Sequence, residues 1–346
     1  MIDLRSDILS PLRPEVGAAF VEAAVRAPAY GIGEDLDERA LEEEVADLFG
    51  FEAALLVPTG TMANQIAVRL ACSPGECLLA DASSHIATNE MQSTVGLSAV
   101  CPVTRQGAGG HLSAMQIDEA LAPPPPNKAA RQVRLVCLEN THNRAGGTVM
   151  PPHCLAEIVQ ILSGRRAALH LDGARLWNAA VALDLSDPEL PHLTAGADTA
   201  SINLNKALGA PLGSLFLGTQ AAVREAAALR RVMGGWWRPL GPIAAAARAA
   251  LSDFRERLAQ DHAHAAFFAK KLAEGGVRVT APETNIVMVR FGDPEAALRH
   301  LASVGVAATE YGSGRLRFVF HGGVGAEETR TAADSVLTIP GEYIYG

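Results

Sequence analysis

Two strand-length segments that each lead to a charged side chain constrain this chain more than any other feature. The first covers residues 167–171 and is followed by Asp172, and the second covers residues 200–205 and is followed by Lys206. In open parallel sheets the functional groups gather outside the carboxyl ends of the strands. We therefore expect the carboxylate of Asp172 and the amine of Lys206 to lie at the same edge of a sheet.

The alternation of strand and helix patterns predicts the kind of sheet. Such an order is typical of an α/β fold with a mixed, mostly parallel sheet covered by helices on both faces. The last strand pattern follows Lys206 too closely for a crossover helix, so we expect this strand to be antiparallel. The strand patterns lie at residues 55–57, 77–80, 99–103, 133–138, 167–172, 200–205 and 213–218.

The remaining segments predict an N-terminal arm and a second domain. The first thirty-odd residues mix polar groups with prolines and are expected to pack as an arm on another surface. Residues 242–272 contain few helix breakers and predict one long helix. We predict a large domain over residues 1–245 and a smaller α+β domain over residues 246–346. In the smaller domain, strands are expected at 277–280, 286–291 and 316–320, and helices at 295–304 and 327–337.

Charge and cysteine content exclude several classes of function. The chain carries a formal net charge of -9 and has no basic stripe that could neutralise a phosphate backbone, so we expect no nucleic-acid partner. Neither a signal-peptide pattern nor an apolar run of membrane-spanning length occurs, which predicts a cytoplasmic protein without a membrane partner. The five cysteines include no Cys-x-x-Cys pair, so we expect neither a disulfide framework nor a metal site.

A lysine and an aspartate at one sheet edge suit the cofactor pyridoxal 5′-phosphate (PLP). PLP needs a lysine for its Schiff base and an acid against its pyridinium nitrogen. Burial among apolar neighbours lowers the pKa of a lysine ammonium, which makes the free amine available. Two other interpretations stay open, because Lys206 can simply reach solvent from a strand end and Asp172 can cap the following helix.

Further candidate residues follow other predicted strands. Residues 59–61 (Thr-Gly-Thr) stand between a strand and a helix, where free backbone N–H groups can bind a phosphate. His85 opens a helix. It is either a functional group, for stacking or acid–base chemistry, or a surface residue. His142 belongs to a polar cluster that follows an apolar strand. Arg175 and Arg317 are candidates for clamping a carboxylate, although each would by default be a solvated surface residue.

Taken in this order, the motifs resemble those of the L-threonine aldolase and β-eliminating lyase family. The resemblance implies a fold-type-I, PLP-dependent enzyme with a fold like that of aspartate aminotransferase. It extends from Ile2 at least to His321. The matching pieces are residues 2–7 (IDLRSD), 58–64 (PTGTMAN), 139–143 (ENTHN), 172–175 (DGAR), Lys206 with 208–214 (LGAPLGS), and Arg317 shortly before His321.

The resemblance implies which residues bind the cofactor. Lys206 looks like the Schiff-base lysine, and Asp172 looks like the partner of the pyridine nitrogen. His85 resembles the family histidine that stacks on the cofactor ring. Gly60 and Thr61 resemble the phosphate-binding turn of the family.

It also implies which residues bind the substrate and how the chain assembles. Ser6, Arg175 and Arg317 resemble the groups that hold the carboxylate of an amino-acid substrate. Arg238 is expected to reach a phosphate from a neighbouring subunit. The family is typically tetrameric, which predicts a homotetramer built as a dimer of dimers.

The implied reaction is the retro-aldol cleavage of a β-hydroxy-α-amino acid, L-threonine or L-allo-threonine, to glycine and an aldehyde. A base must remove the proton of the β-hydroxyl group, and His85, His142 or an ordered water is the candidate.

Several departures from the family pattern keep other functions open. Asn205 and Ala207 flank the lysine where serine and glycine are usual, and Arg144 stands where a glycine commonly follows the asparagine. Trp236 and Trp237 occupy a segment that is usually rich in glycine. The alternatives are a related PLP-dependent lyase, racemase or transferase, or a catalytically silent member that binds the cofactor. A nicotinamide-dependent enzyme is disfavoured because no Gly-x-Gly-x-x-Gly motif follows a strand.

Overall fold

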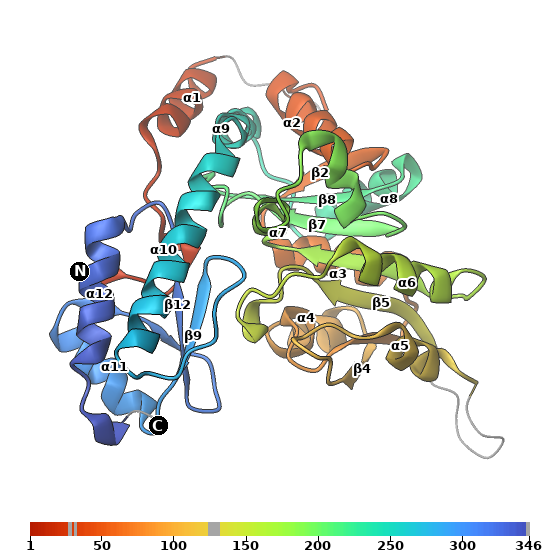
Figure 1. Ribbon diagram of the computed structural model, residues 1–346. Helices are drawn as coiled ribbons and strands as arrows, with labels where there is room; N and C mark the ends of the chain where they lie inside the picture. Colours follow the sequence, from red (N-terminus) through yellow and green to blue (C-terminus); the bar gives the residue numbers. More distant parts are fainter. Residues whose placement is uncertain (27–29, 31–32, 124–131, 344–346) are drawn as a thin grey trace.

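A computed structural model of the chain describes residues 1–26, 30, 33–123 and 132–343. A seven-stranded sheet lies between layers of helices, and a smaller group of strands and helices lies beside it (Figure 1). The strands of the large sheet are β2 (Ala53–Val57), β3 (Cys77–Asp81), β4 (Cys101–Arg105), β5 (Val133–Glu139), β6 (Ala168–Gly173), β7 (Thr199–Asn203) and β8 (Ser214–Gly218).

The strand order in the large sheet is β2-β8-β7-β6-β5-β3-β4. Neighbouring strands from β4 to β7 are parallel, whereas β8 is antiparallel to both β7 and β2. The α/β class, the mixed and mostly parallel sheet and the antiparallel strand after Lys206 are therefore confirmed. Because β6 and β7 are parallel neighbours, their carboxyl ends lie side by side.

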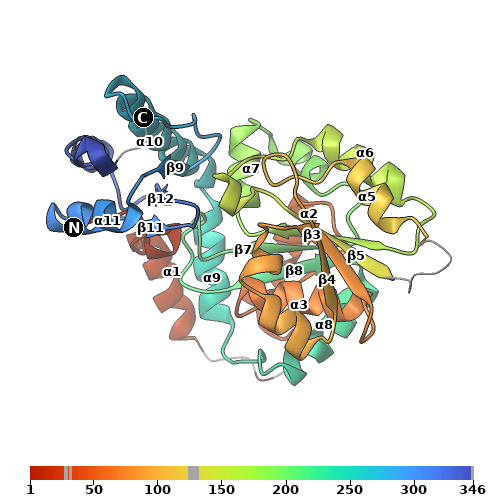
Figure 2. The same cartoon turned by 90° about the horizontal axis from the view of Figure 1, so that it is seen from below.

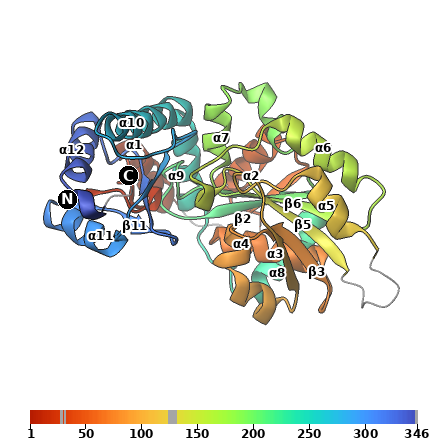
Figure 3. The ribbon, with the colours of Figure 1, turned by 60° about the horizontal axis from the view of Figure 1, so that its bottom comes forward.

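Helices cover both faces of this sheet (Figure 2). On one face α3 packs against α8 and contacts β7 and β8, and α4 lies beside α3 (Figure 3). The opposite face carries α2, α5, α6 and α7. These helices are α2 (Leu36–Leu48), α3 (Gly60–Ala71), α4 (His85–Thr88), α5 (Ala114–Leu121), α6 (Pro152–Leu162), α7 (Leu176–Ala182) and α8 (Gln220–Val232).

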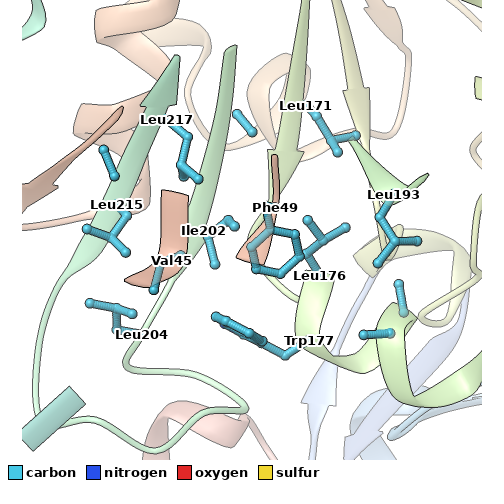
Figure 4. Close-up of a cluster of buried hydrophobic side chains, with 14 of the residues drawn as sticks. Val45, Phe49, Leu171, Leu176, Trp177, Leu193, Ile202, Leu204, Leu215 and Leu217 are labelled. Carbon is cyan, nitrogen blue, oxygen red and sulfur yellow. The ribbon is translucent and has the colours of Figure 1, made fainter. Parts of the chain in front are cut away.

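The two-residue period of the strands separates apolar from polar side chains. Leu171 and Ile202 face α2 and α7, where they belong to a large apolar cluster with Trp177 (Figure 4). Asp172 and Ser201 point to the opposite face and contact α3. The strands that form the core therefore also deliver polar groups to the α3 side of the sheet.

The C-terminal elements build a second apolar core around the antiparallel sheet β11-β12-β9. At the other end of the chain, β1 (Ile2–Asp3) pairs in parallel with β10, and Leu4 packs in this second core. The C-terminal strands are β9 (Ile286–Arg290), β10 (Val306–Ala307), β11 (Thr309–Glu310) and β12 (Arg315–Val319). The remaining helices are α1 (Pro14–Ala24), α9 (Gly241–Leu251), α10 (Phe254–Glu274), α11 (Pro294–Ser303) and α12 (Ala326–Leu337). Short helical turns cover Asp7–Leu9, Ser93–Leu97, Asn143–Ala145, Asp187–Leu193 and Gly341–Tyr343.

The predicted long helix over 242–272 is two helices, α9 and α10. Asp253 leaves the helical conformation at a φ of -136°, and its carboxylate forms ion pairs with Arg13 and Arg257. The N-terminal arm is also more regular than expected, since it contains α1, which packs on α9. The predicted boundary between residues 245 and 246 falls inside α9 and stays a prediction.

The strand predicted at 277–280 is reduced to a single bridge between Val279 and Val289. The segment leaves the sheet edge before Pro282, which has no N–H group to donate to a neighbouring strand. Among the described residues, no helix is both long enough and apolar enough to span a bilayer.

Candidate active site

Lys206 follows the carboxyl end of β7 and is half-buried. Burial lowers the pKa of its ammonium and the nearby Arg175 lowers it further, while the charge of Asp172 opposes both; the net shift is downward. Within the described part of the chain, the amine makes no hydrogen bond or ion pair with another residue. A lowered pKa favours the free amine, and an unpaired free amine at this position can attack a carbonyl group.

Asp172 occupies the carboxyl end of the neighbouring strand β6 and is only 4% exposed. Its Oδ2 accepts a hydrogen bond of 2.8 Å from Nδ2 of Asn64, and its Oδ1 accepts one of 3.1 Å from the N–H of Ala174. Burial raises the pKa of this carboxyl group, but the charges of His85 and Lys206 outweigh burial and the net pKa is lowered. Asp172 is therefore an ionised carboxylate, and it does not cap α7, which begins after Arg175.

Asn64 on α3 fixes the orientation of this carboxylate, and sequence reasoning did not single it out for this role. Its Nδ2 also donates to Glu90 at 3.1 Å, while its Oδ1 accepts from Ser201 at 2.7 Å and contacts His170 Nε2 at 3.1 Å. Burial lowers the pKa of His170 to about 4, so this imidazole is neutral. Both polar atoms of the Asn64 side chain thus form hydrogen bonds, and Asn64 holds the carboxylate of Asp172 from helix α3.

His85 opens α4, as predicted, and its backbone N–H donates to Oε2 of Glu139 at 2.6 Å. Its Nδ1 lies 3.0 Å from Oε1 of Glu90. Because a carboxylate only accepts, Nδ1 carries the hydrogen and Nε2 is left to accept a proton. Burial lowers the pKa of His85, but the hydrogen bond to Glu90 and the charge of Asp172 outweigh burial and raise the net pKa.

His142 is completely buried, and both of its ring nitrogens face other groups. Nδ1 accepts from the N–H of Ala145 at 3.3 Å, and Nε2 lies 3.3 Å from Oδ1 of Asp81. Burial lowers its pKa, but the carboxylates of Asp81 and Glu139 outweigh burial and raise it. Because the ring is completely buried between Asp81 and the turn that follows it, His142 supports this turn and is not exposed to meet a substrate.

Arg175 has a buried carboxylate partner, Asp7, which sequence reasoning did not identify. Nε and Nη2 of Arg175 donate to the two oxygens of Asp7 at 2.8 and 2.7 Å, and both side chains are almost fully buried. Burial raises the pKa of Asp7, but Arg175 outweighs burial and the pKa falls to about 2. The guanidinium predicted to hold a substrate carboxylate is thus already neutralised by its own chain.

Arg317 on β12, by contrast, has neutral partners. Nη1 donates to Oδ1 of Asn143 at 2.6 Å and to the hydroxyl of Tyr311 at 2.7 Å, and Nη2 donates to the carbonyl of Arg5 at 2.8 Å. Its Nε is buried without an acceptor, and no carboxylate pairs with it in the described part of the chain. Burial lowers the pKa of Arg317 to about 10, and repulsion from Arg175 contributes. This guanidinium therefore has no partner of opposite charge among the described residues, and an anionic ligand would supply one.

The start of α3 lies against the end of β7. Thr59 caps the helix by accepting the N–H of Met62 at 3.1 Å, so the first helical N–H groups, those of Gly60 and Thr61, have no partner inside the helix. A Cβ atom on Gly60 would lie 2.5 Å from Oδ1 of Asn203, so only glycine fits there without a shift of that side chain. This Oδ1 atom is itself buried without a hydrogen bond.

Ser6 and Arg238 are the remaining predicted site residues. Ser6 precedes Asp7, and its Oγ accepts the N–H of Ile8 at 3.3 Å. Arg238 is exposed, donates to the carbonyl of Tyr30 at 2.6 Å, and its guanidinium carbon lies 4.7 Å from the ring centre of Trp236. Among the described residues, these contacts of Arg238 are with Tyr30 and Trp236 and do not involve Lys206 or Asp172.

These groups fit PLP. The unpaired amine of Lys206 suits an aldehyde, and the ionised, firmly held Asp172 suits a protonated pyridine nitrogen. The free N–H groups at the start of α3, next to a glycine that cannot carry a Cβ atom, suit a phosphate.

Residues 3–294 match the sequence profile of a protein family that is described as beta-eliminating lyase. The chain belongs to this family. It is 34% identical to low-specificity L-threonine aldolase 1 of Arabidopsis thaliana over 336 residues, which cover 92% of this chain and 91% of the relative. It is 36% identical to the low specificity L-threonine aldolase of Escherichia coli over 300 residues, 86% of each chain.

Solved structures of this family and of other PLP enzymes share its fold. The threonine aldolase of Leishmania major superposes with a TM-score of 0.83 at 20% identity, covering 97% of this chain and 98% of that one. A serine palmitoyltransferase structure that contains PLP gives a TM-score of 0.74 at 20% identity, covering 98% and 87%. The fold-type-I architecture expected from the sequence is therefore confirmed.

Proposed function

We propose that this chain is a PLP-dependent aldolase that cleaves a β-hydroxy-α-amino acid, L-threonine or L-allo-threonine, to glycine and an aldehyde. It is a carbon–carbon lyase and uses PLP as its cofactor. The observation that carries the proposal is the unpaired, half-buried amine of Lys206 beside the ionised carboxylate of Asp172. Membership of the beta-eliminating lyase family and extensive identity to threonine aldolases support it.

The cofactor half of the site is formed by Lys206, Asp172, His85 and the start of α3. Lys206 attaches the cofactor, and Asp172 holds a proton on the pyridine nitrogen. When bound, PLP supplies the electron sink for the electron pair that remains on Cα when the Cα–Cβ bond breaks. Gly60 and Thr61 offer their backbone N–H groups to the phosphate.

The substrate half is formed by Arg317 together with residues from the start of the chain. Arg317 binds the substrate carboxylate, because its guanidinium is buried among neutral partners and one of its nitrogens lacks an acceptor. Arg175 is a weaker candidate for direct binding since Asp7 neutralises its charge and accepts hydrogen bonds from its Nε and Nη2. Its role is to fix Asp7, and with it the neighbouring Ser6, beside the substrate.

His85 is the better candidate for the base. Glu90 receives the hydrogen on Nδ1, which leaves Nε2 to take the proton of the β-hydroxyl group. His142 is instead a positioning residue, because Ala145 and Asp81 engage its two nitrogens.

The test is the ultraviolet–visible spectrum of the purified protein, recorded with and without each amino acid while released aldehyde is assayed. We expect a visible band of lysine-bound PLP, a change of this band with L-threonine or L-allo-threonine, and release of acetaldehyde. A band that responds to amino acids without aldehyde release would replace the aldolase by a related PLP-dependent lyase, racemase or transferase. Absence of the band after addition of PLP would overturn the cofactor assignment.

We further propose a homotetramer that works in the cytoplasm. Met91, Val95 and Leu97 are exposed apolar side chains just after α4, and contact with a second subunit would cover them. Arg238 is exposed, which is compatible with the proposal that it reaches the phosphate site of a neighbouring subunit. All five cysteines are unpaired, as a reducing compartment requires. Light scattering coupled to size-exclusion chromatography tests the assembly, and a mass of one chain would refute it.

A further inference from the structure

A cavity of about 520 Å³ lies beside the substrate half of the site. The turn at residues 145–148 forms one wall, and the segment at residues 278–283 forms another. Strand β9 and the start of β12 form its floor. The cavity does not include Lys206, Asp172 or Arg317, so it is separate from the site described above.

The strand register explains why arginines gather there. β9 and β12 are antiparallel, with Arg315 opposite Arg290 and Arg317 opposite Met288. Directly opposed residues share a face of the sheet, as do residues two apart on one strand. The face that presents Arg317 to the substrate half therefore also presents Arg290 and Arg315, while the intervening residues pack in the second apolar core.

A third guanidinium, that of Arg278, lines the same cavity. In the described part of the chain, the guanidinium groups of Arg278 and Arg290 form no hydrogen bond or ion pair. Arg315 donates only to backbone carbonyl groups, at 3.4 and 3.3 Å. None of the three guanidinium groups therefore forms an ion pair with a side chain in the described part of the chain.

The one carboxylate that lines the cavity, Glu283, is engaged elsewhere, since its Oε2 accepts the N–H of Val149 at 2.8 Å. Three guanidinium groups and one carboxylate leave the cavity with an excess of two positive charges. Other arginines, such as Arg134 beside Glu76, form ion pairs with acids. At this cavity three guanidinium groups without such a partner are gathered around one hollow.

We propose that this cavity is a second binding site and that its ligand is a small organic dianion, either a phosphate monoester or a dicarboxylate. Guanidinium groups form paired, charge-assisted hydrogen bonds with both kinds of anion. Val279, Ile286 and Met288 line the remainder of the cavity and suit a short apolar body between or beside the charged groups. Two excess positive charges match the charge of the ligand.

The site lies close enough to the substrate half for the two to share a segment. Arg315 donates to the carbonyl of Arg144, which directly follows the Asn143 that contacts Arg317. A Cβ on Gly146 would lie 3.4 Å from Met288, so the turn packs tightly on the floor of the cavity. The binding measurement must therefore separate the two sites.

The test is isothermal titration of the PLP-loaded enzyme with glycerol 3-phosphate and, separately, with succinate, each with and without saturating glycine. We expect one of the two probes to bind one site per chain in both conditions, and the identity of that probe decides between phosphate and dicarboxylate. Arg278→Ala/Arg290→Ala should weaken this binding at least about tenfold, because charge-assisted hydrogen bonds to both guanidinium groups are lost. Arg299→Ala is the matched control, since Arg299 is an exposed arginine on α11.

Two results would overturn the proposal. One is that neither probe binds the unaltered enzyme, and the other is that the double variant binds as tightly as the unaltered enzyme. Arg278→Gln/Arg290→Gln is a second double variant, which removes both charges but keeps polar side chains. Retention of the visible PLP band shows that a variant is folded. Both arginines are exposed, so these changes leave the apolar cores intact.

Discussion

The cofactor half and the substrate half of the candidate site are built in different ways. Asp172 and Lys206 come from the ends of two adjacent strands, and one helix, α3, holds the carboxylate. The substrate half is gathered from distant parts of the chain, since Arg317 donates to the carbonyl of Arg5, 312 positions earlier. The first half is a product of local sheet topology, and the second requires both ends of the chain to meet.

This difference predicts different consequences of substitution. Residues of the cofactor half are expected to act on the chemical step and on the PLP spectrum. Residues of the substrate half are expected to act on KM or on stability and to leave the spectrum unchanged. The predictions that follow test this separation.

The largest effect is expected for Lys206→Ala. Without the amine that attaches the cofactor, kcat/KM should fall at least about 10³-fold and the visible PLP band should disappear. Steady-state aldehyde release and absorbance measure the two effects. Lys270→Ala, which alters an exposed lysine on α10, should leave both unchanged. Full activity in Lys206→Ala would exclude the proposed chemistry.

Asp172→Asn should reduce kcat about 10²–10³-fold, because a neutral amide no longer stabilises the positive charge on the ring nitrogen. PLP should still bind, since Lys206 and the start of α3 are unaltered. Asp184→Asn removes an exposed carboxylate outside the site and is the control for the loss of charge. An unchanged kcat in Asp172→Asn would show that the carboxylate does not contact the cofactor.

Asp7→Asn should lower the free energy of unfolding by about 3–5 kcal/mol at neutral pH, since it leaves the guanidinium of Arg175 buried without its counter-charge. The pKa of Asp7 is lowered to about 2 from 3.8, so the carboxylate contributes stability above pH 4 and loses it as the pH falls towards 2. Urea unfolding at several pH values should show the difference from the unaltered protein shrinking with acid.

The exposed pair of Arg255 and Asp187 supplies the comparison for Asp7→Asn. Asp187→Asn should cost less than about 1 kcal/mol, because solvent screens that pair. Equal losses in the two variants would mean that the Asp7 and Arg175 pair is no more important to folding than a surface contact.

Tyr311→Phe should raise KM for the amino acid about threefold to tenfold at nearly constant kcat. The hydroxyl group accepts hydrogen bonds from Arg317 and Asn143, and one such bond contributes about 0.5–1.5 kcal/mol. The PLP band should not change. If the band weakened instead, the two halves of the site could not be treated as separate.

The smallest effect is expected for Arg144→Gly. The guanidinium carbon of Arg144 lies 4.8 Å from the ring centre of Tyr311, and an exposed contact of this kind contributes about 0.5–1 kcal/mol. We expect KM to rise about twofold to fivefold as Tyr311 loses this support. The KM of Arg144→Lys, which keeps the charge, should lie between that of Arg144→Gly and that of the unaltered enzyme. A change in kcat alone would contradict the assignment of Arg144 to the substrate half.

The sequence was sufficient for the parts of the site that strand topology dictates. Polar groups after apolar strands predicted Asp172 and Lys206, and the parallel pairing of β6 with β7 brings the ends of these strands together. Asn64 and Asp7 carried no such signal, because their roles depend on partners more than a hundred positions away. The functional roles of the site residues stay predictions until the variants are measured.

The errors in the predicted fold have a similar origin. The division into α9 and α10 occurs at Asp253, whose carboxylate pairs with Arg13, 240 positions away in the chain. The reduced strand near Val279 depends on how the chain leaves a sheet edge. Helix and strand propensity act over a few residues, so neither feature could be read from local pattern.

The pairing of β1 with β10 has a consequence for how the enzyme matures on the ribosome. The segment that contains residues 2–7 is synthesised well before its partners at Val306 and Arg317. All seven strands of the large sheet, β2 to β8, precede β9 in the chain. The substrate carboxylate site is completed only when Arg317 has been synthesised and meets the segment at residues 2–7, so a chain that ends before Arg317 lacks the group proposed to bind the substrate carboxylate.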